Sequence, residues 1–146
     1  MHSSIINYHL RGAPGFWGCY SHRGLDQTLA RIRTGWLIVH VEEHWVVLYV
    51  QGKTLIMLET LGTQKGNIRL LTRDLADYHI YVNNARLQSD LSDACGLYCI
   101  LFVKLKISCL CTFNQYLSLF SSHHLIQNDV ILYQLLIKIE NKENEP

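Results

Sequence analysis

The sequence predicts an α+β domain in which a small mixed or antiparallel sheet packs against helices. Short runs rich in β-branched and aromatic residues lie in the first half of the chain, and such runs favour strands. Longer apolar runs fill the second half, and their length is typical of buried helices. At 146 residues the chain is long enough to bury the core of one domain. We expect this domain over residues 1–139 and a solvated tail over residues 140–146.

The strands are expected between residues 36 and 83. The preceding residues 1–24 are expected to be irregular, because "RGAPGFWGCYSHRG" holds four of the nine glycines. The predicted strands are 36–41, 44–50, 54–60 and 79–83. The short polar turn "QGK" at 51–53 makes 44–60 a β-hairpin.

Helices are expected on both sides of the last strand. A loop and a short amphipathic helix are expected over 63–78, with Ile68, Leu71 and Leu75 on one face. After a polar loop, the continuous apolar run of residues 94–108 predicts a buried helix. Two further helices are predicted over 112–120 and 129–139, the second capped by Asn128 or Asp129.

Composition excludes several function classes. The net charge of +1 gives no bulk attraction to nucleic acid, so only weak DNA binding is expected. The longest apolar run, residues 94–103, is far shorter than the roughly 20 residues of a spanning helix. No signal peptide is visible at the start of the sequence. We therefore expect a soluble, intracellular protein without membrane contact, and its oligomeric state stays open.

The cysteines predict reduced thiols. There are five, an odd number in a chain without a secretion signal, which disfavours a disulfide framework. The spacings Cys95-x3-Cys99 and Cys109-x-Cys111 do not form the usual pair of zinc knuckles, so no metal site is expected.

Cys95 is the candidate nucleophile. Ser92 or Asp93 is a natural helix cap, which would place Cys95 in the first turn of the apolar helix. Unpaired backbone N–H groups there lower the pKa of a thiol and favour the reactive thiolate. Gly96 would let a substrate backbone come close. Taken alone, Cys95 is better explained as an inert core residue.

Three further residues would complete a catalytic site. A thiolate needs an imidazole, and His44 opens a strand at the end of the predicted hairpin, where Glu59 would lie close enough to orient it. The amide of Gln88 could donate to the oxyanion, beside the Cys95 backbone N–H. The alternatives are an exposed pair at the hairpin end and an ordinary loop glutamine.

These residues, in the order His–Glu–Gln–Cys, resemble the adenovirus-type cysteine proteases, the adenain family, and their relatives in Polinton-like mobile elements. The motifs are "HW" at 44–45, "LETLG" with Glu59, and "LQSDLSDACGLYCILF" with Gln88 and Cys95. "GFWGCY" and "FNQYLSLFS" also resemble that family's terminal segments. The resemblance covers nearly the whole chain and implies an adenain/Ulp1-like fold.

The resemblance implies a thiol endopeptidase that cleaves viral precursor polypeptides during virion maturation, often after a Gly-containing motif, in the host nucleus or the virion. Cys95 would be the nucleophile and His44 the general base and acid. Glu59 would orient the histidine, and Gln88 would donate to the oxyanion hole. Trp45 and Gly96 would line the substrate-binding site.

The chain departs from adenain in its regulation. Adenain carries an activating viral peptide on a cysteine upstream of the glutamine, but residues 76–87 here contain no cysteine. We expect no required cofactor; an activating peptide or DNA stays possible, without a disulfide tether.

Two other functions stay open. Ubiquitin- and SUMO-type isopeptidases share the His–acid–Gln–Cys order, although "DACGLYC" and the small size favour the viral type. A protease-like module without catalysis, serving structure or interaction, is the other alternative; the intact quartet argues against it.

Overall fold

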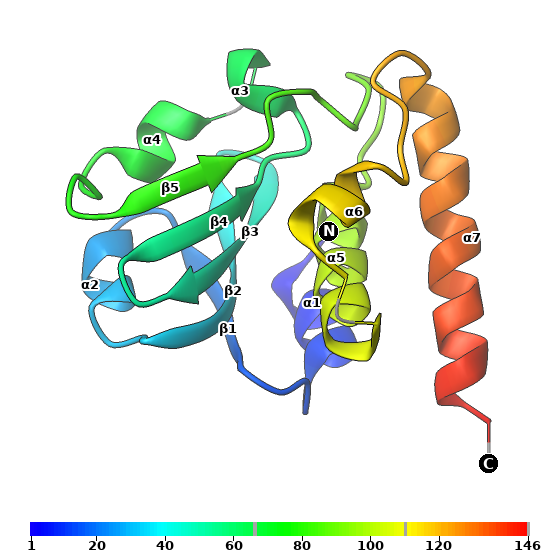
Figure 1. Ribbon diagram of the computed structural model, residues 1–146, viewed down its shortest axis with the longest axis horizontal. Coiled ribbons are helices and arrows are strands. Elements are labelled where there is room, and N and C mark those ends of the chain that lie inside the picture. Colours follow the sequence, from blue (N-terminus) through cyan, green and yellow to red (C-terminus); the bar gives the residue numbers. More distant parts are fainter. Residues whose placement is uncertain (66, 110, 146) are drawn as a thin grey trace.

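A mixed β-sheet lies between layers of helices in the computed structural model, which describes residues 1–65, 67–109 and 111–145 (Figure 1). Three predictions fall partly outside the described residues: the 63–78 segment at Gly66, the Cys109-x-Cys111 spacing at the Cys109 side chain, and the 140–146 tail at Pro146. The α+β class and the packing of the sheet against helices agree with the prediction.

In the described part of the chain the sheet has five strands in the order β1-β2-β3-β4-β5. The strands are β1 (Phe16–Ser21), β2 (Thr34–Val41), β3 (His44–Gln51), β4 (Thr54–Leu58) and β5 (His79–Val82). The central pairs β2–β3 and β3–β4 are antiparallel, and the outer pairs β1–β2 and β4–β5 are parallel. The four predicted strands are therefore confirmed, and the sheet is mixed.

The β3–β4 hairpin and its turn are confirmed, and the structure gives its register. Gln51 pairs with Thr54, and Val47 pairs with Leu58. Gly52 in the turn has φ 61°, a left-handed conformation that glycine adopts without steric cost. Since the two strands run antiparallel, the start of β3 and the end of β4 lie at the same end of the sheet.

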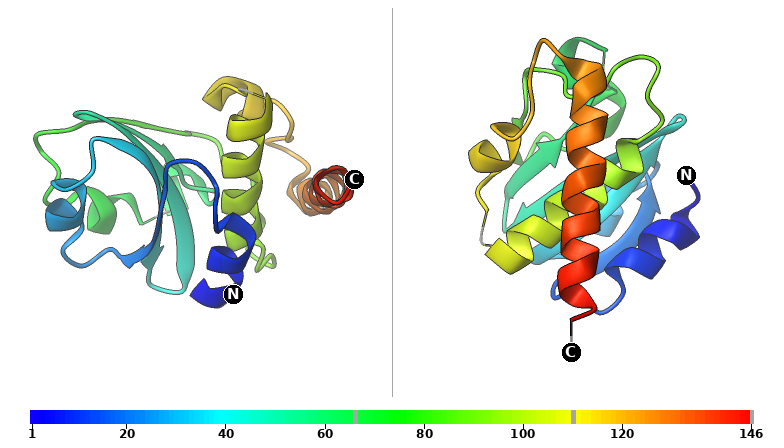
Figure 2. Two further views of the ribbon diagram at one scale, coloured as in Figure 1. Left: turned by 90° about the horizontal axis from the view of Figure 1, so that it is seen from below. Right: turned by 90° about the vertical axis from the view of Figure 1, so that its right-hand side faces the viewer.

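The helices are α1 (Ser3–Leu10), α2 (Leu25–Leu29), α3 (Gly62–Lys65), α4 (Ile68–Thr72), α5 (Cys95–Cys109), α6 (Phe113–Leu117) and α7 (Leu125–Glu143). The predicted buried helix is confirmed as α5, which lies between the sheet and α7 (Figure 2). Helix α1 packs beside α5 on the same face of the sheet.

The prediction of an irregular start was wrong, because residues 1–24 contain α1 and β1. One of the glycines that suggested a loop, Gly18, lies inside a strand. Gly18 has φ 117° within β1, and the pairing of β1 with β2 shifts register between Phe16 and Cys19. A glycine inside a strand often marks such a bulge, so the segment is an irregular strand.

The expected cap and end of the last helix were also wrong. Helix α7 begins at Leu125, so Asn128 and Asp129 lie inside it. It continues to Glu143, into the segment expected as a tail, and the carboxylate of Glu143 accepts from Lys104 Nζ on α5 at 2.8 and 2.9 Å. This ion pair holds the end of α7 against α5.

Each face of the sheet has its own apolar core. One core joins the sheet to α1, α5, α6 and α7, and Cys99, Leu101 and Val103 on α5 are 0% exposed there. The other core joins the sheet to α2 and α4 and includes Leu71 and Leu75, as predicted. Burial of each large aliphatic side chain contributes about 1.5–3 kcal/mol. No helix in the described ranges is both long and apolar enough to cross a membrane.

Asn128 ties α7 to the loop that precedes α5. Its side chain is 0% exposed, its Nδ2 donates to the Leu87 carbonyl at 2.8 Å and to the Ser121 carbonyl at 2.7 Å, and its Oδ1 accepts from the Ser121 N–H at 2.8 Å. These three bonds explain why the Asn128 side chain is tolerated on a buried helix face, because a buried polar group without partners would destabilise the fold.

We expect Asn128→Ala to destabilise the fold by about 1–3 kcal/mol, since it leaves buried carbonyl groups without a donor. Urea unfolding followed by circular dichroism measures the change. Ile126→Ala on the same helix, where the side chain is 67% exposed, is the control and should stay within about 0.5 kcal/mol of the unchanged chain. Equal unfolding midpoints for both variants would contradict the tie.

Candidate active site

Three of the predicted site residues, His44, Glu59 and Cys95, lie together where β3 and α5 begin and β4 ends. His44 is the first residue of β3, Glu59 follows the last residue of β4, and Cys95 is the first residue of α5. Gln88 lies in the loop that leads from β5 to α5 (Figure 1). All four side chains are buried, so the site is enclosed by its own scaffold.

His44 and Glu59 form a buried pair. Nε2 of His44 lies 2.5 Å from Oε1 of Glu59, and the two residues are 7% and 0% exposed. The carboxylate also accepts from the backbone N–H of Leu61 at 3.0 Å and from that of Asn67 at 3.3 Å. These donors compensate the cost of burying a charge. The pair is therefore a buried structural unit, and the alternative of an exposed hairpin end is wrong.

Asn83 fixes the backbone that carries Glu59. Its Oδ1 accepts from the Glu59 N–H at 2.8 Å, and its Nδ2 donates to the Glu59 carbonyl at 2.6 Å. Asn83 is 3% exposed and directly follows β5. The Asn83 side chain thus continues the hydrogen bonding between β4 and β5 just beyond the last backbone pair of these strands.

The thiol of Cys95 is hydrogen-bonded to the ring of His44. Because Nε2 faces Glu59, the ring nitrogen left for the sulfur is Nδ1. Burial disfavours the thiolate, but the bond to His44 and the backbone N–H groups of Trp45 and Gly96 outweigh it and lower the pKa of Cys95. Cys95 therefore ionises more readily than an ordinary thiol.

The histidine shifts in the complementary direction. Burial disfavours the imidazolium, but the hydrogen bonds to Cys95 and Glu59 outweigh it and raise the pKa of His44 to about 9. With the pKa of Cys95 lowered and that of His44 raised, the proton at neutral pH belongs on the imidazole. The arrangement can hold a thiolate–imidazolium pair, the reactive form of cysteine hydrolases.

Two other cysteines provide a contrast within the same chain. Burial raises the pKa of the Cys19 thiol to about 11 and that of Cys99 well above its ordinary value. Cys99 lies one helical turn after Cys95 on α5, with its thiol 3.6 Å from the Trp45 carbonyl. Burial without an imidazole partner therefore makes a thiol inert here, and His44 accounts for the difference at Cys95.

The start of α5 differs from the predicted cap. The helix begins at Cys95, and the Ala94 carbonyl accepts from the N–H groups of Leu97 at 2.9 Å and Tyr98 at 3.1 Å. Ser92 Oγ accepts from the Ala94 N–H at 3.2 Å, so Ser92 supports the turn from two residues before the helix. Neither Ser92 nor Asp93 is the cap. Cys95 still lies in the first turn, where unpaired N–H groups favour an anion.

Gln88 is held by hydrogen bonds at both ends of its amide. It is 3% exposed, its Nε2 donates to the Ser92 carbonyl at 2.7 Å, and its Oε1 accepts from Thr60 Oγ1 at 2.6 Å. The backbone is fixed as well, because Arg86 Nε donates to the Gln88 carbonyl at 2.8 Å. Gln88 thus lies in a loop, as the sequence indicated, with its amide buried and hydrogen-bonded on both sides.

Trp45 and Gly96 contact the first residue of the chain. Trp45 is 6% exposed, and its indole N–H donates to the Met1 carbonyl at 3.0 Å. A Cβ placed on Gly96 would lie 2.6 Å from the Met1 sulfur. The space beside Gly96, expected for a substrate backbone, is thus taken by Met1. Trp45 packs into the core and against His40, and its backbone N–H serves Cys95.

Thr60 and Asn83 were missed from the sequence, and Asn128 was expected only as a helix cap. Each is a buried polar side chain that orders a site residue or the loop beside it. Thr60 adjoins Glu59 in "LETLG" and Asn83 ends "HIYVN", so their positions next to strand ends were the only available signal.

In residues 1–65, 67–109 and 111–145, no group of three or more His, Cys, Asp or Glu side chains is placed to hold a metal ion. Among the described cysteine side chains, Cys19, Cys95, Cys99 and Cys111 are not disulfide-bonded.

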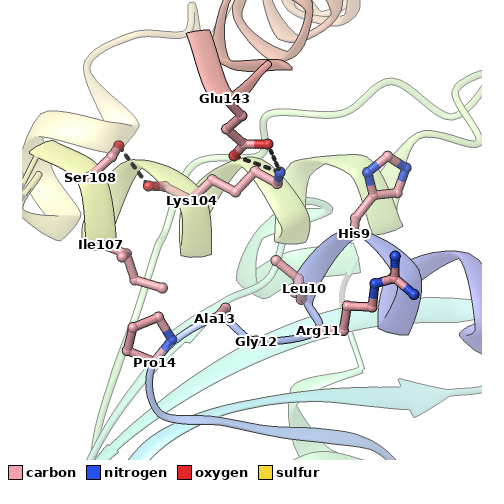
Figure 3. A pocket seen from close by; sticks show the side chains of 10 residues that line it. All are labelled: His9, Leu10, Arg11, Gly12, Ala13, Pro14, Lys104, Ile107, Ser108 and Glu143. Atoms are coloured by element: carbon pink, nitrogen blue, oxygen red, sulfur yellow. Dashed lines mark hydrogen bonds and ion pairs between the residues drawn. The ribbon is translucent and has the colours of Figure 1, made fainter. Parts of the chain in front are cut away.

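A pocket of about 290 Å³ lies elsewhere, at the end of α5 remote from Cys95 (Figure 3). It is lined by the end of α1, the following loop and the side chains of Lys104 and Ile107, and Glu143 closes it from α7. The Lys104–Glu143 ion pair spans its wall. The pocket holds none of the four site residues, so we do not assign the chemistry to it.

Comparison with known proteins identifies a shared fold. No protein-family model and no curated protein matches the chain. Among solved structures, it is similar to the central domain of the uncharacterized Lpg1148 protein from Legionella pneumophila. The TM-score is 0.55 with 10% identity, over 99% of this chain and 98% of that chain. The likeness covers the whole chain and concerns its fold.

Cys95 should react with iodoacetamide below the pH at which an ordinary thiol reacts. An ordinary thiol with a pKa near 8.5 is only about 1% thiolate at pH 6.5. We expect alkylation of the unchanged chain at pH 6.5 to be at least about tenfold faster than in His44→Ala, which removes the partner that lowers the pKa. Mass spectrometry of the Cys95 and Cys99 peptides measures both rates, with Cys99 as internal control. Equal Cys95 rates in the two proteins would contradict the ion pair.

Proposed function

We propose that this chain is a cysteine endopeptidase of the adenain type that cleaves viral, or virus-derived, precursor proteins. The observation that carries the proposal is the thiol of Cys95 at the start of α5, hydrogen-bonded to His44, whose other nitrogen lies 2.5 Å from the buried Glu59. Nucleophile, base and orienting acid are in the relation that covalent catalysis requires.

The reaction follows from the proton positions. The thiolate of Cys95 attacks the carbonyl carbon of the scissile peptide, and the carbonyl electron pair moves onto its oxygen. Imidazolium His44 gives its proton to the leaving amine as the C–N bond breaks, which leaves a thioester on Cys95. Neutral His44 then takes a proton from water, and the resulting hydroxide attacks the thioester. The C–S bond breaks, the carboxyl product is released and the Cys95 thiolate is regenerated. Glu59 keeps the ring oriented and stabilises its charged form throughout.

The negative oxygen of the intermediate needs hydrogen-bond donors. The backbone N–H of Cys95 belongs to the first turn of α5, whose amides lack partners within the helix. Of the two hydrogens on Gln88 Nε2, one is donated to the Ser92 carbonyl at 2.7 Å, and we assign the second to the oxyanion. A single donor of this kind contributes about 10²–10³ in rate.

The viral type of substrate rests on the sequence motifs. "HW", "LETLG" and "LQSDLSDACGLYC" occur in the order of adenain, and the fold would then be the adenain/Ulp1-like fold. Cleavage would follow a Gly-containing motif, and virion maturation would place the enzyme in the host nucleus or the virion. Activation by DNA or a viral peptide would be non-covalent, since residues 76–87 lack a cysteine for a tether.

A proteome-derived peptide library tests the proposal without a named substrate. We expect the purified chain to generate new termini after Gly-containing sequences, detected by mass spectrometry. Cys95→Ala and His44→Ala should each lower the rate by at least about 10³-fold, because the covalent route is lost. Cys19→Ala, which also removes a thiol, should retain activity.

Fusions of ubiquitin and SUMO to a reporter are tested in parallel. Preferred cleavage of these fusions would contradict the viral-type substrate and favour an isopeptidase. Equal cleavage by the unchanged chain and Cys95→Ala would contradict a cysteine protease altogether.

A further inference from the structure

We infer that Thr60 is a positioning residue that sets the orientation of the Gln88 amide and thereby prepares the oxyanion hole. The inference rests on the proposed function, because it gives a role to a residue beside the same site. Thr60 is 0% exposed and directly follows Glu59 in the chain. Its side chain does not belong to the nucleophile, the base or the orienting acid.

The hydrogen bonds allow one orientation of the Gln88 amide. The Ser92 carbonyl can only accept, so the group that lies 2.7 Å from it must be the amide nitrogen. The amide oxygen then faces Thr60 Oγ1 at 2.6 Å, and the hydroxyl must donate. If the amide flipped, its oxygen would face the Ser92 carbonyl oxygen, and two acceptors would repel. The Ser92 carbonyl therefore selects this orientation, and the Thr60 hydroxyl holds it by donating to the amide oxygen, so that nitrogen, and not oxygen, is available to a substrate oxygen.

The backbone of Thr60 supports the same residue. Its carbonyl accepts from the N–H of Leu87 at 2.8 Å and from that of Gln88 at 3.0 Å. Asn128 Nδ2 holds the Leu87 carbonyl from the opposite side at 2.8 Å. Since these bonds do not involve the Thr60 hydroxyl, the segment should keep its place when that hydroxyl is removed. The side chain can thus be tested separately from the loop.

Two neighbouring residues thereby order the two halves of the site. Glu59 contacts the general base His44, and Thr60 contacts the oxyanion donor Gln88. The backbone of this dipeptide is fixed by Asn83 on one side and by the Leu87–Gln88 segment on the other. Base and oxyanion donor are consequently held relative to one another by a single rigid segment, as preorganised catalysis requires.

Thr60→Val tests the inference because valine keeps the shape and removes the hydroxyl. With a peptide substrate found for the unchanged chain, we expect kcat to fall about 10- to 100-fold, less than or equal to the roughly 10²–10³-fold cost of losing an oxyanion donor in Gln88→Ala. KM should change little. Thr60→Ser restores the donor and should recover most of kcat. The double variant Thr60→Val with Gln88→Ala should be no slower than Gln88→Ala alone, since both act through one group.

Alkylation of Cys95 by iodoacetamide separates positioning from general damage, because this displacement forms no oxyanion. We expect its rate and pH profile in Thr60→Val to equal those of the unchanged chain. Unchanged kcat in Thr60→Val would overturn the inference. A low kcat in Thr60→Ser together with slower alkylation of Cys95 in Thr60→Val would also overturn the inference, because it would show a merely structural role for Thr60.

A spectroscopic readout keeps the test independent of activity. In ¹⁵N-labelled protein, we expect the side-chain amide of Gln88 to give two sharp, well-separated proton signals in the unchanged chain and in Thr60→Ser. In Thr60→Val these signals should broaden or converge as the amide loses its fixed orientation. Unaltered Gln88 signals would overturn the inference. Absence of Cys95-dependent cleavage with these signals behaving as expected would overturn the proposed function alone.

Discussion

The buried carboxylate of Glu59 is the constraint on which the rest of the site depends. A carboxylate with 0% exposure needs hydrogen-bond donors, because an unpaired buried charge is costly. His44 Nε2 and the N–H groups of Leu61 and Asn67 supply them. The histidine ring is thereby fixed with its other nitrogen toward Cys95, so satisfying the carboxylate also prepares the nucleophile.

The fold satisfies this requirement because the start of β3, the end of β4 and the start of α5 lie at one place. The antiparallel β3–β4 hairpin brings His44 and Glu59 to the same end of the sheet, and α5 begins there with Cys95. Helix α5 is held between the sheet and α7, so the position of the thiol depends on the core that joins these elements (Figure 2). Asn128 extends this support from α7 to the loop before Gln88.

The sequence was informative where one physical signal dominated. β-branched and aromatic residues around the polar turn at 51–53 predicted the hairpin, and an uninterrupted apolar run predicted α5. The candidate site could be proposed because residue types and order were sufficient, although distances were not. Helix α1 was missed because the glycines that follow it suggested an irregular segment. Thr60 was missed and Asn128 was given the wrong role, because their importance lies in partners distant in sequence, which no local pattern encodes.

Titration of the His44 ring by ¹⁵N NMR tests the central claim most directly, since the thiolate–imidazolium pair requires a protonated ring at neutral pH. We predict an imidazolium at pH 7 that titrates with a pKa of about 9 in the unchanged chain and at lower pH in Cys95→Ala, where its hydrogen bond to the thiolate is lost. A ring that is neutral at pH 7 and titrates near the ordinary value of about 6.5 would contradict the account.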